Sequence, residues 1–406
     1  MARIEGVRIQ NFRALKDVTL GRTADNRDAE PLPKMIAAIG PNGSGKSTLM
    51  DALGFIGDCL SEGVEEACNK PHRGGFERLR TQGVSEPIRL AIYYRQSDED
   101  NPIGYTVEID LDGNRRPYVV RELAKQRTSK TSGRYFEFLN IKGSTATAWA
   151  GKTLDKTNRK QKRTLKLDDR RRLGIATLGN LTDHPRIVEF RAFLEGWYLS
   201  YFVPDVARGL PMSGAQRHLN KLGDNLANYV QFMEQEHGPR FKRILREVAK
   251  SIPGVERIRT KTAPDGRLLI QFNDRGFTAP FFATDMSDGT LKTLAYLLLL
   301  EDPDPAPLIG IEEPENGLHH QLLGPLAMEM KRRAEEASGP QVFVTTHSPY
   351  FVDALRPAEV FILDKGRDGY TSIVRAADIQ GVSELSAEGI PLGSLWYSDH
   401  FGKGNP

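Results

Sequence analysis

The sequence predicts an α/β fold: a split head, made of a mixed sheet with flanking helices, that is interrupted by an inserted basic and helical lobe. Short apolar strands that end in glycine or in polar residues occur near both ends of the chain, as is typical of buried strands in an α/β sheet. A basic segment and two helical stretches separate these strands. We therefore expect an N-terminal lobe (1–120), a basic and helical insertion (121–264) and a C-terminal lobe (265–406).

The composition is that of an ordinary globular protein. Of the 406 residues, 39% are hydrophobic and 27% are charged, which excludes disordered, collagen-like and disulfide-scaffold classes for the chain as a whole. The net charge of +3 hides an asymmetry, because residues 121–172 hold 16 Lys and Arg against 5 Asp and Glu, and the rest holds 40 against 48. Such a basic block either contacts a polyanion or is a solvated insertion.

The cysteines and the hydropathy pattern bear on the compartment. Cys59 and Cys68 are too few and too close together for a disulfide framework, so we expect a reducing, cytoplasmic environment. The first 15 residues lack the apolar stretch of a signal peptide. The longest apolar run, residues 294–300, is far shorter than the ~20 residues that span a bilayer. We therefore expect no membrane partner.

The N-terminal part has the pattern of strands around one helix. Residues 1–20 alternate as a strand pair would, and residues 35–40 are a short apolar run that ends in glycine. Residues 46–60 have helical periodicity, and residues 88–120 alternate again as strands. The basic segment 121–172 is poor in large aliphatic residues, so we expect it to build little core by itself.

The C-terminal part mixes helical and strand patterns. We expect helices over residues 186–202, 226–248 and 291–300, and strands over residues 268–272, 307–313 and 341–348.

The most specific motif is GPNGSGKST at residues 40–48. It fits G-x-x-x-x-G-K-[ST] and lies between an apolar strand and a helix, which is the context that a P-loop requires. In such a loop, backbone N–H groups and a helix N-terminus bind nucleotide phosphates, Lys46 reaches the β- and γ-phosphates, and Ser47 is a Mg²⁺ ligand. The predicted nucleotide-binding residues are Gly40, Asn42, Gly43, Ser44, Gly45, Lys46, Ser47 and Thr48.

Two adjacent carboxylates, Glu312 and Glu313, follow the apolar strand of residues 307–313. Ligands bind at the carboxyl ends of strands in α/β sheets, and phosphoryl transfer needs positioning and charge neutralisation there. By position, Glu312 is the predicted metal ligand and Glu313 the predicted base. A solvated strand end is the plainer alternative.

Two weaker signals complete the set. His347 ends the strand TTHS, where an imidazole could lie beside the γ-phosphate, although a lone histidine is more often a surface or core residue. Ser287 and Gly289 precede an apolar helix, where they could face an anion or simply form a helix cap.

Together these motifs resemble the ABC type of P-loop ATPase. The P-loop (40–48), a signature (287–289), the acidic strand (308–313) and a switch histidine occur in the order of that family. The branch with SMC, RecF and OLD-family proteins fits best. The set of motifs resembles that of stand-alone AAA-family ATPases of prokaryotic anti-phage defence. The resemblance covers residues 1–120 and 265–365.

The resemblance implies ATP and Mg²⁺ as cofactors, with catalytic roles for Lys46, Glu313 and His347. It also implies a homodimer, with a higher assembly as a further option, in which Ser287 and Gly289 of one subunit bind the ATP of the other. The loop 316–319 then falls at the dimer contact.

The sequence departs from the family pattern at two positions. The signature has Asp288 where transporters have glycine, and Glu312 stands where aspartate is usual. Both departures favour slow or regulated turnover over a fast motor. Gln82 and Gln96 are the candidates for the glutamine loop that the family carries.

Other classes fit less well. A transporter ATPase would not separate Lys46 from Ser287 by 241 residues, and a hexameric AAA+ motor would lack TTHSP. An OLD-type nuclease module needs D-x-D at a strand end after the ATPase, and the sequence has D-x-D at residues 98–100, 110–112 and 302–304, all before that point. We therefore expect no intrinsic nuclease.

Two biological hypotheses remain. In one, the ATPase is a sensor that restrains a separate effector, a nuclease or toxin, in anti-phage defence. In the other, the heads form a RecF- or SMC-like clamp on DNA in repair or maintenance. The basic residues that would contact DNA are Lys152, Lys156, Arg159, Lys160, Lys162, Arg163 and Arg170–Arg172.

Overall fold

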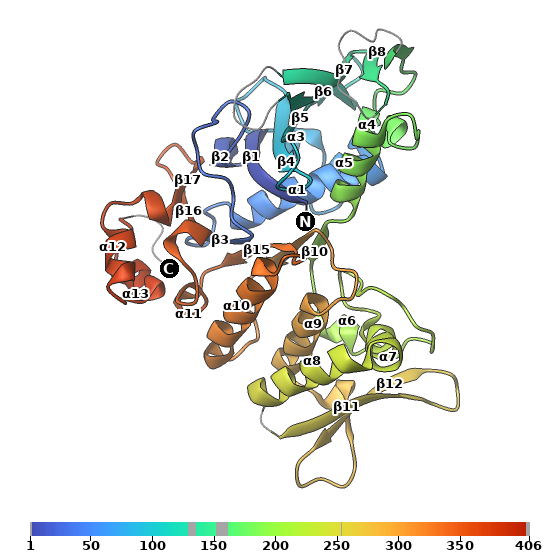
Figure 1. Cartoon of the computed structure of the whole chain (residues 1–406), viewed down its shortest axis with the longest axis vertical. Coiled ribbons are helices and arrows are strands. Elements are labelled where there is room, and N and C mark those ends of the chain that lie inside the picture. Colours follow the sequence, from blue (N-terminus) through green and yellow to red (C-terminus); the bar gives the residue numbers. More distant parts are fainter. Residues whose placement is uncertain (1, 129–134, 152–160, 253, 403–406) are drawn as a thin grey trace.

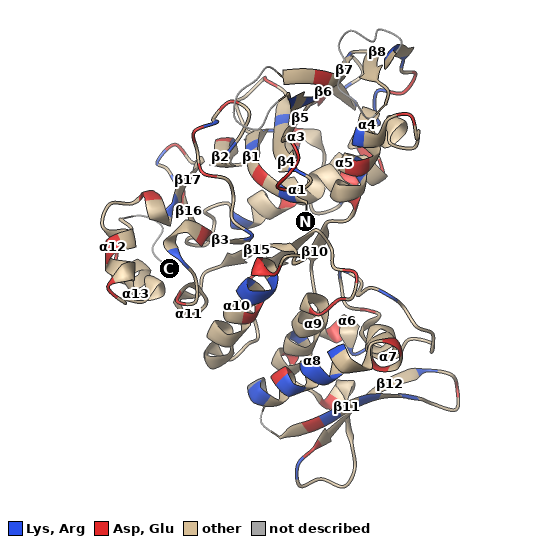
Figure 2. Ribbon diagram, in the orientation of Figure 1, with Lys and Arg blue, Asp and Glu red and all other residues tan. Residues whose placement is uncertain are grey.

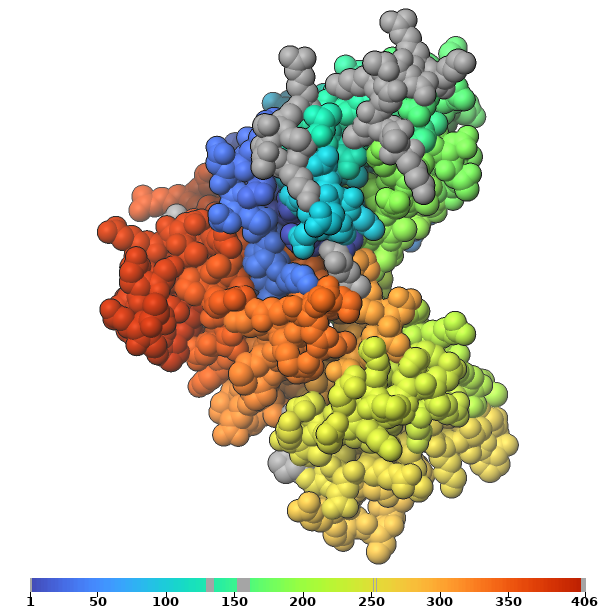
Figure 3. Space-filling model, in the orientation of Figure 1, coloured from blue at the N-terminus to red at the C-terminus, as the bar shows by residue number. Residues whose placement is uncertain are grey.

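A computed structural model describes residues 2–128, 135–151, 161–252 and 254–402 of the chain. It comprises an upper lobe, a central sheet and a lower lobe (Figure 1). In the space-filling view the lower lobe stands apart from the upper lobe, with the orange surface of the region that contains α10 beside it (Figure 3). In the parts described, no helix combines the length and the hydrophobicity needed to cross a membrane.

The upper lobe is built on an antiparallel sheet whose described strands run in the order β2-β1-β4-β5-β6-β7-β8-β9. The strand pair and the β pattern expected over residues 1–20 and 88–120 are confirmed. The strands are β1 (Arg3–Phe12), β2 (Leu15–Gly21), β4 (Ile88–Arg95), β5 (Ile103–Leu111), β6 (Pro117–Arg127), β7 (Tyr135–Lys142), β8 (Thr145–Trp149) and β9 (Lys162–Lys166).

The basic segment corrects one expectation. Phe136, Phe138 and Ile141 of β7 are buried in the same core as the N-terminal strands, so the segment does contribute core. A strand with one solvated face needs apolar residues only at alternate positions, which is why a low aliphatic content did not exclude it. Residue 120 lies inside β6, and the predicted boundary between 1–120 and 121–264 therefore does not coincide with a break in the sheet.

Helix α1 (Lys46–Ser61) links the upper sheet to the central one, because it contacts β1 on one side and β14 and β15 on the other. It is buried nearly all round, from Leu49 to Leu60. Around it lie α2 (Val64–Asn69), α3 (Phe76–Leu79), α4 (Gly174–Leu178) and α5 (Pro185–Glu195).

Glu122 of β6 anchors the start of α4 inside the upper lobe. Its carboxylate accepts hydrogen bonds from the Tyr105 hydroxyl at 3.1 Å and from the backbone N–H groups of Gly174 and Ile175 at 2.5 and 2.9 Å. Burial raises the pKa of Glu122 to about 7, and the three donors oppose that rise.

The central sheet has the order β10-β14-β15-β3-β16-β17 and is parallel except for β17. Its strands are β10 (Tyr198–Ser200), β14 (Leu308–Glu312), β15 (Gln341–Thr346), β3 (Met35–Ile39), β16 (Val360–Lys365) and β17 (Thr371–Arg375). Its companions are α10 (His320–Glu335), α11 (Pro349–Val352), α12 (Val382–Ala387), α13 (Leu392–Tyr397), η3 (Pro357–Glu359) and η4 (Ala376–Asp378).

The expected helix over 186–202 is only partly right, because α5 ends at Glu195 and Tyr198–Ser200 pairs with β14 as an edge strand. Gly196 ends the helix, and the aromatic and β-forming residues after it join the sheet. The predicted strands at 35–40, 307–313 and 341–348 are confirmed as β3, β14 and β15.

The lower lobe contains α6 (Pro204–Ala207), α7 (Leu226–Glu236), α8 (Gly238–Ser251), the sheet of β11 (Val255–Thr262), β12 (Leu268–Asp274) and β13 (Phe281–Phe282), then η2 (Ala283–Asp285) and α9 (Asp288–Leu300). The strand expected at 268–272 and the helix expected at 291–300 are confirmed as β12 and α9. The single helix expected over 226–248 is two helices, because Gly238 and Pro239 begin a new one. Residue 264 falls in the turn between β11 and β12, so the second predicted boundary also cuts a continuous unit.

Candidate functional site

The P-loop follows β3 and ends where α1 begins. Gly40, Gly43 and Gly45 have φ values of 144°, 81° and 105°, a backbone region that glycine adopts without the penalty of a Cβ atom. A Cβ on Gly45 would lie 2.5 Å from the Thr371 Oγ1 atom, and that hydroxyl donates to the Ser44 carbonyl at 2.8 Å. The glycines therefore allow a tight loop that β17 holds in place.

The interior of the loop suits a phosphate. The Lys46 ammonium lies over the loop and donates to the Gly40 and Pro41 carbonyls at 2.7 and 3.1 Å. Burial lowers the pKa of Lys46, and the nearby carboxylates of Glu313 and Glu315 oppose that shift. The Ser44 hydroxyl is buried and has no hydrogen-bond partner among the described residues. These groups fit a nucleotide triphosphate, which supplies acceptors for all of them.

Glu312 and Ser47 are the pair that could hold Mg²⁺. Burial raises the pKa of Glu312, while a hydrogen bond from the Ser47 hydroxyl lowers it. A carboxylate and a hydroxyl at the mouth of a P-loop are oxygen ligands of the kind that Mg²⁺ takes. When bound, the ion would neutralise charge on the phosphates.

Glu313 lies just beyond β14 in a strained conformation, with φ of 41°. Its backbone N–H donates to the Thr345 carbonyl at 2.8 Å, and its carboxylate accepts from the Asn316 side-chain amide at 2.9 Å. The second carboxylate oxygen lies 3.9 Å from the His347 Nδ1 atom. Strain held by such bonds is common at functional sites.

Glu315 was missed by the sequence reasoning. Its Oε1 atom accepts from the Thr346 hydroxyl at 2.8 Å and from the His347 backbone N–H at 2.6 Å, and it lies 3.2 Å from the His347 Nδ1 atom. Its side chain is only 7% exposed. Glu315 thus fixes the position of His347, and a third acidic residue in the run EEPE was the signal available for it.

The signature residues lie at the start of α9. The exposed Ser287 hydroxyl caps that helix by accepting from the Thr290 N–H at 3.2 Å. Gly289 packs against the loop after β14, because a Cβ there would lie 2.8 Å from the Gly317 carbonyl oxygen. Lys292 donates to the Asn316 carbonyl at 2.5 Å. The structure thus joins Gly289 and Lys292 to the 316–319 loop of their own chain, while Ser287 caps the same helix.

The site therefore divides in two. The P-loop, Glu312, Glu313 and His347 follow three adjacent strands, β3, β15 and β14, at one edge of the sheet. Ser287 and Gly289 belong to the lower lobe, and Gly289 contacts the loop after β14.

Neither candidate for the glutamine loop lies at this edge. Gln82 precedes β4 and Gln96 follows it, so both lie in loops of the upper lobe. The residue beside Glu312 is Tyr201, since Ser200 pairs with Ile311 in the register of β10 and β14. Burial, together with the charges of Glu312 and Asp51, raises the pKa of Tyr201 to about 12. The sequence reasoning missed Tyr201 because it assigned residues 186–202 to a helix.

A buried ion cluster, also missed, fixes α1 below the P-loop. The Arg73 guanidinium, 1% exposed, contacts Asp51 and Asp58 of α1 at 2.8 and 2.7 Å, and Arg13 contacts Asp51 at 3.1 Å. This cluster ties the start of the upper lobe to the helix that carries Ser47.

Comparison with known proteins identifies the family of the chain. Residues 37–353 match the family described as AAA domain, putative AbiEii toxin, Type IV TA system. No curated protein sequence matches the chain.

Solved structures show the same fold. The crystal structure of an SMC head bound to the C-winged helix domain of ScpA has a TM-score of 0.51 and 17% identity, and the match covers 91% of this chain and 96% of that one. The SMC head with an extended coiled coil from Pyrococcus furiosus, bound to the C-terminal domain of ScpA, has a TM-score of 0.51 and 17% identity, with 92% and 96% covered. The chain therefore belongs to this AAA-domain family and is a P-loop ATPase of the ABC type, with the fold of an SMC head.

Proposed function

We propose that the chain is an ATP-driven switch that works as a homodimer and controls a separate effector, a nuclease or toxin, in anti-phage defence. ATP would bind between two heads, and its hydrolysis would release them. The observation that carries this proposal is the division of the site, because Ser287 is exposed on the lower lobe while the P-loop and the carboxylates lie on the central sheet.

The geometry supports the following residue roles. Lys46 and the P-loop backbone would bind the triphosphate, and Ser47 and Glu312 would hold Mg²⁺. Glu313 would accept the proton of the attacking water, and His347, held by Glu315, would contact the γ-phosphate. General bases of this kind act within hydrogen-bond reach of the proton that they remove.

The dimer proposal rests on Ser287 and Gly289. Gly289 and Lys292 contact the 316–319 loop of their own chain, and they lie in the helix that Ser287 caps. A movement of a partner's nucleotide against Ser287 would therefore pass along this helix to Asn316, which contacts Glu313. Two heads that exchange these residues would each complete the other's site.

The effector rests on the comparisons. The family description names a toxin of a toxin–antitoxin system, and the SMC heads that share this fold carry a bound domain of another protein, ScpA. A partner protein that binds differently to the open and closed states of the dimer is consistent with the family description and with the SMC heads.

Mixing two inactive variants tests the shared site. Ser287→Arg should bind ATP but not hydrolyse it, and Lys46→Ala should not bind ATP. Their mixture should regain up to about a quarter of wild-type activity, because a mixed dimer has one intact site of two and forms in about half of random pairings. Each variant alone is the control, and a mixture without any activity would count against shared sites.

DNA binding is the second candidate function. Lys162 and Lys166 are exposed on the edge strand β9, whereas the exposed Arg171 pairs with Glu65 and Asp169. Lys152, Lys156, Arg159 and Lys160 lie outside the described residues. Deleting 152–172 would remove β9, so the double substitution Lys162→Glu and Lys166→Glu is the cleaner test. DNA affinity that falls in this variant, with a shallower dependence on salt, would support a DNA clamp, and unchanged affinity would remove β9 from that role.

A further inference from the structure

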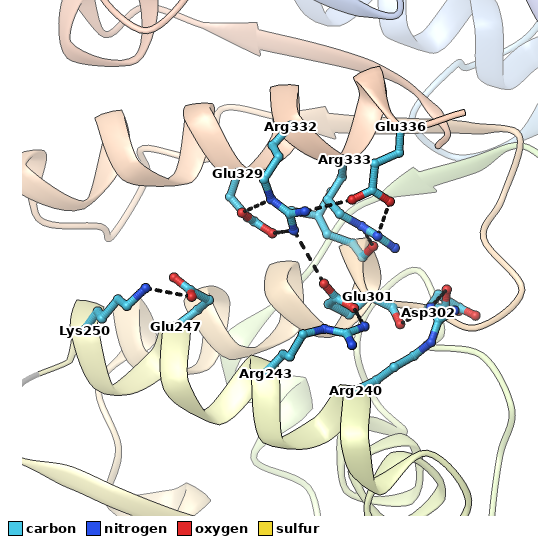
Figure 4. A network of polar contacts seen from close by, with 11 residues as sticks. Arg240, Arg243, Glu247, Lys250, Glu301, Asp302, Glu329, Arg332, Arg333 and Glu336 are labelled. Carbon is cyan, nitrogen blue, oxygen red and sulfur yellow. Dashed lines mark hydrogen bonds and ion pairs between the residues drawn. The ribbon is translucent and has the colours of Figure 1, made fainter. Parts of the chain in front are cut away.

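A polar groove lies between α8 of the lower lobe and α10 beside the central sheet. Its volume is about 630 Å³, within the roughly 300–1,000 Å³ of pockets that hold small ligands. Figure 4 shows the charged side chains of the two helices directed toward one another across it. None of its described lining residues belongs to the nucleotide site.

The groove has more positive than negative charge. Among the described lining residues, six are cationic and four are acidic, and Figure 2 shows the blue bands of these cations on α8 and α10. The cations are Arg240, Arg243, Arg246, Lys250, Arg332 and Arg333, and the acids are Glu247, Glu301, Glu329 and Glu336.

Each acidic residue is already paired inside the groove. Glu247 accepts from Lys250 at 2.8 Å, and Glu301 lies 2.9 Å from Arg243. On α10, Glu329 and Glu336 both pair with Arg332, at 2.5 and 2.7 Å. Glu336 also pairs with Arg333 at 2.5 Å. Four of the six cations are thereby neutralised by carboxylates of the groove.

Arg240 and Arg246 are the two described lining cations that no carboxylate of the groove neutralises. Arg240 donates only to the backbone carbonyls of Glu301 and Asp302, at 3.3 and 3.2 Å, and no described carboxylate pairs with it. Arg246 is exposed and makes no hydrogen bond or ion pair with any residue that the structure describes. The two lie on α8 about 9 Å apart along its axis, at 1.5 Å per residue.

The rest of the lining suits an organic ligand as well as an ion. Ile244 and Leu297 give the groove an apolar part. A guanidinium presents a planar fork of donors that matches two phosphate oxygens. A ligand with more than one phosphate group could therefore engage Arg240 and Arg246 together.

We propose that this groove binds a small anion with two or more phosphate groups, with Arg240 and Arg246 as its principal donors. The source could be a free oligophosphate or the phosphate chain of a nucleotide. This site goes beyond the ATPase and does not depend on it.

The test uses the full chain with Lys46→Ala, so that the P-loop does not contribute. Calorimetric titrations with tripolyphosphate and with ATP, at about 150 mM salt so that long-range attraction is screened, should show one site per chain. Similar affinities would assign the phosphate chain as the ligand, and a tighter ATP complex would assign a nucleotide. Absence of binding by both probes would overturn the proposal.

A charge reversal at Arg246 locates the site. Arg246→Glu should weaken binding by about tenfold or more, because a charge-assisted hydrogen bond is lost and a repulsion is gained. Lys242→Glu is the matched control, since Lys242 is exposed on the same helix but does not line the groove. Equal weakening by both variants would mean diffuse attraction to a basic helix and would overturn the proposal, as would undiminished binding to Arg246→Glu. Because Arg246 has no partner among the described residues, its substitution should leave the melting temperature unchanged.

Discussion

Replacing Glu313 by glutamine should separate nucleotide binding from hydrolysis. The substitution keeps the size of the side chain and removes its capacity to take a proton. The amide oxygen can still accept the 2.9 Å hydrogen bond from Asn316, and the backbone strain at φ of 41° is the same for either residue. We therefore expect a change in the free energy of unfolding of no more than about 0.5 kcal/mol, as for most partly exposed substitutions.

The effect on the rate should be much larger. A positioned general base contributes about 10²–10⁴-fold to a rate, which corresponds to roughly 3–5 kcal/mol of activation free energy at 1.36 kcal/mol per tenfold change. Removing one negative charge beside the triphosphate should leave ATP affinity equal or tighter. Glu313→Gln should consequently accumulate as an ATP-bound dimer.

Single-turnover hydrolysis at saturating ATP and Mg²⁺ measures the rate, and light scattering behind a sizing column measures the dimer. Glu312→Gln is the matched control, because it alters the neighbouring carboxylate that contacts Ser47. That control should lose the Mg²⁺-dependent part of ATP affinity. Wild-type turnover by Glu313→Gln would refute its role as the base, and identical defects in the two variants would refute the division of labour between the carboxylates.

Three further substitutions test the geometry. Gly45→Ala should weaken ATP binding and lower the melting temperature, because the Cβ meets Thr371 at 2.5 Å and a φ of 105° costs a residue with a side chain about 1–3 kcal/mol. Gly57→Ala is the control, because a Cβ there has no atom within 4 Å. It should leave ATP binding unchanged and should not lower the melting temperature, since alanine is favoured over glycine inside a helix. Glu315→Gln should lower the hydrolysis rate about tenfold through lost positioning of His347, with ATP affinity measured by fluorescent-nucleotide titration unchanged; an equal loss of both would contradict that role. Glu122 has a folded pKa of about 7, above its ordinary value of 4.5, so its contribution to stability is complete below about pH 4.5 and is lost as the pH rises through about 7, by about 3 kcal/mol. Urea unfolding at pH 5 and pH 8 should show a smaller decline for Glu122→Gln than for wild type, and parallel declines would show that Glu122 does not titrate in this range.

The central sheet could be predicted because its signals are local. Strands β3, β14 and β15 are continuous apolar runs with an abrupt polar end, and the P-loop is a fixed pattern of glycines and Lys46. That their polar ends meet follows from parallel pairing alone. Their chemical roles stay predictions until the substitutions above are measured.

The remaining features depend on contacts between distant residues. Tyr201 follows a strand of only three residues, which is too short to show the alternation of a strand. The helical periodicity before it was therefore extended over this position. Glu315 acts through a hydrogen bond to the backbone of His347, 32 residues away, which no spacing rule reports. Arg73 looks like any loop arginine until Asp51 and Asp58 enclose it.

The basic residues of β9 also affect whether the outermost described strand of the upper sheet can pair with another copy of the chain. β9 is the outermost described strand there, and its sequence KRTLK is largely exposed, whereas at the opposite edge β2 contacts β17. An uncovered strand can recruit a strand from another copy, and lysine and arginine along it oppose such pairing. The positive charge of β9 would therefore oppose pairing between copies of the chain whether or not nucleic acid binds there. Substitution of these residues by uncharged ones would change both strand pairing between copies and DNA binding. Reversal to glutamate keeps the edge charged and repulsive, so that it tests DNA binding alone.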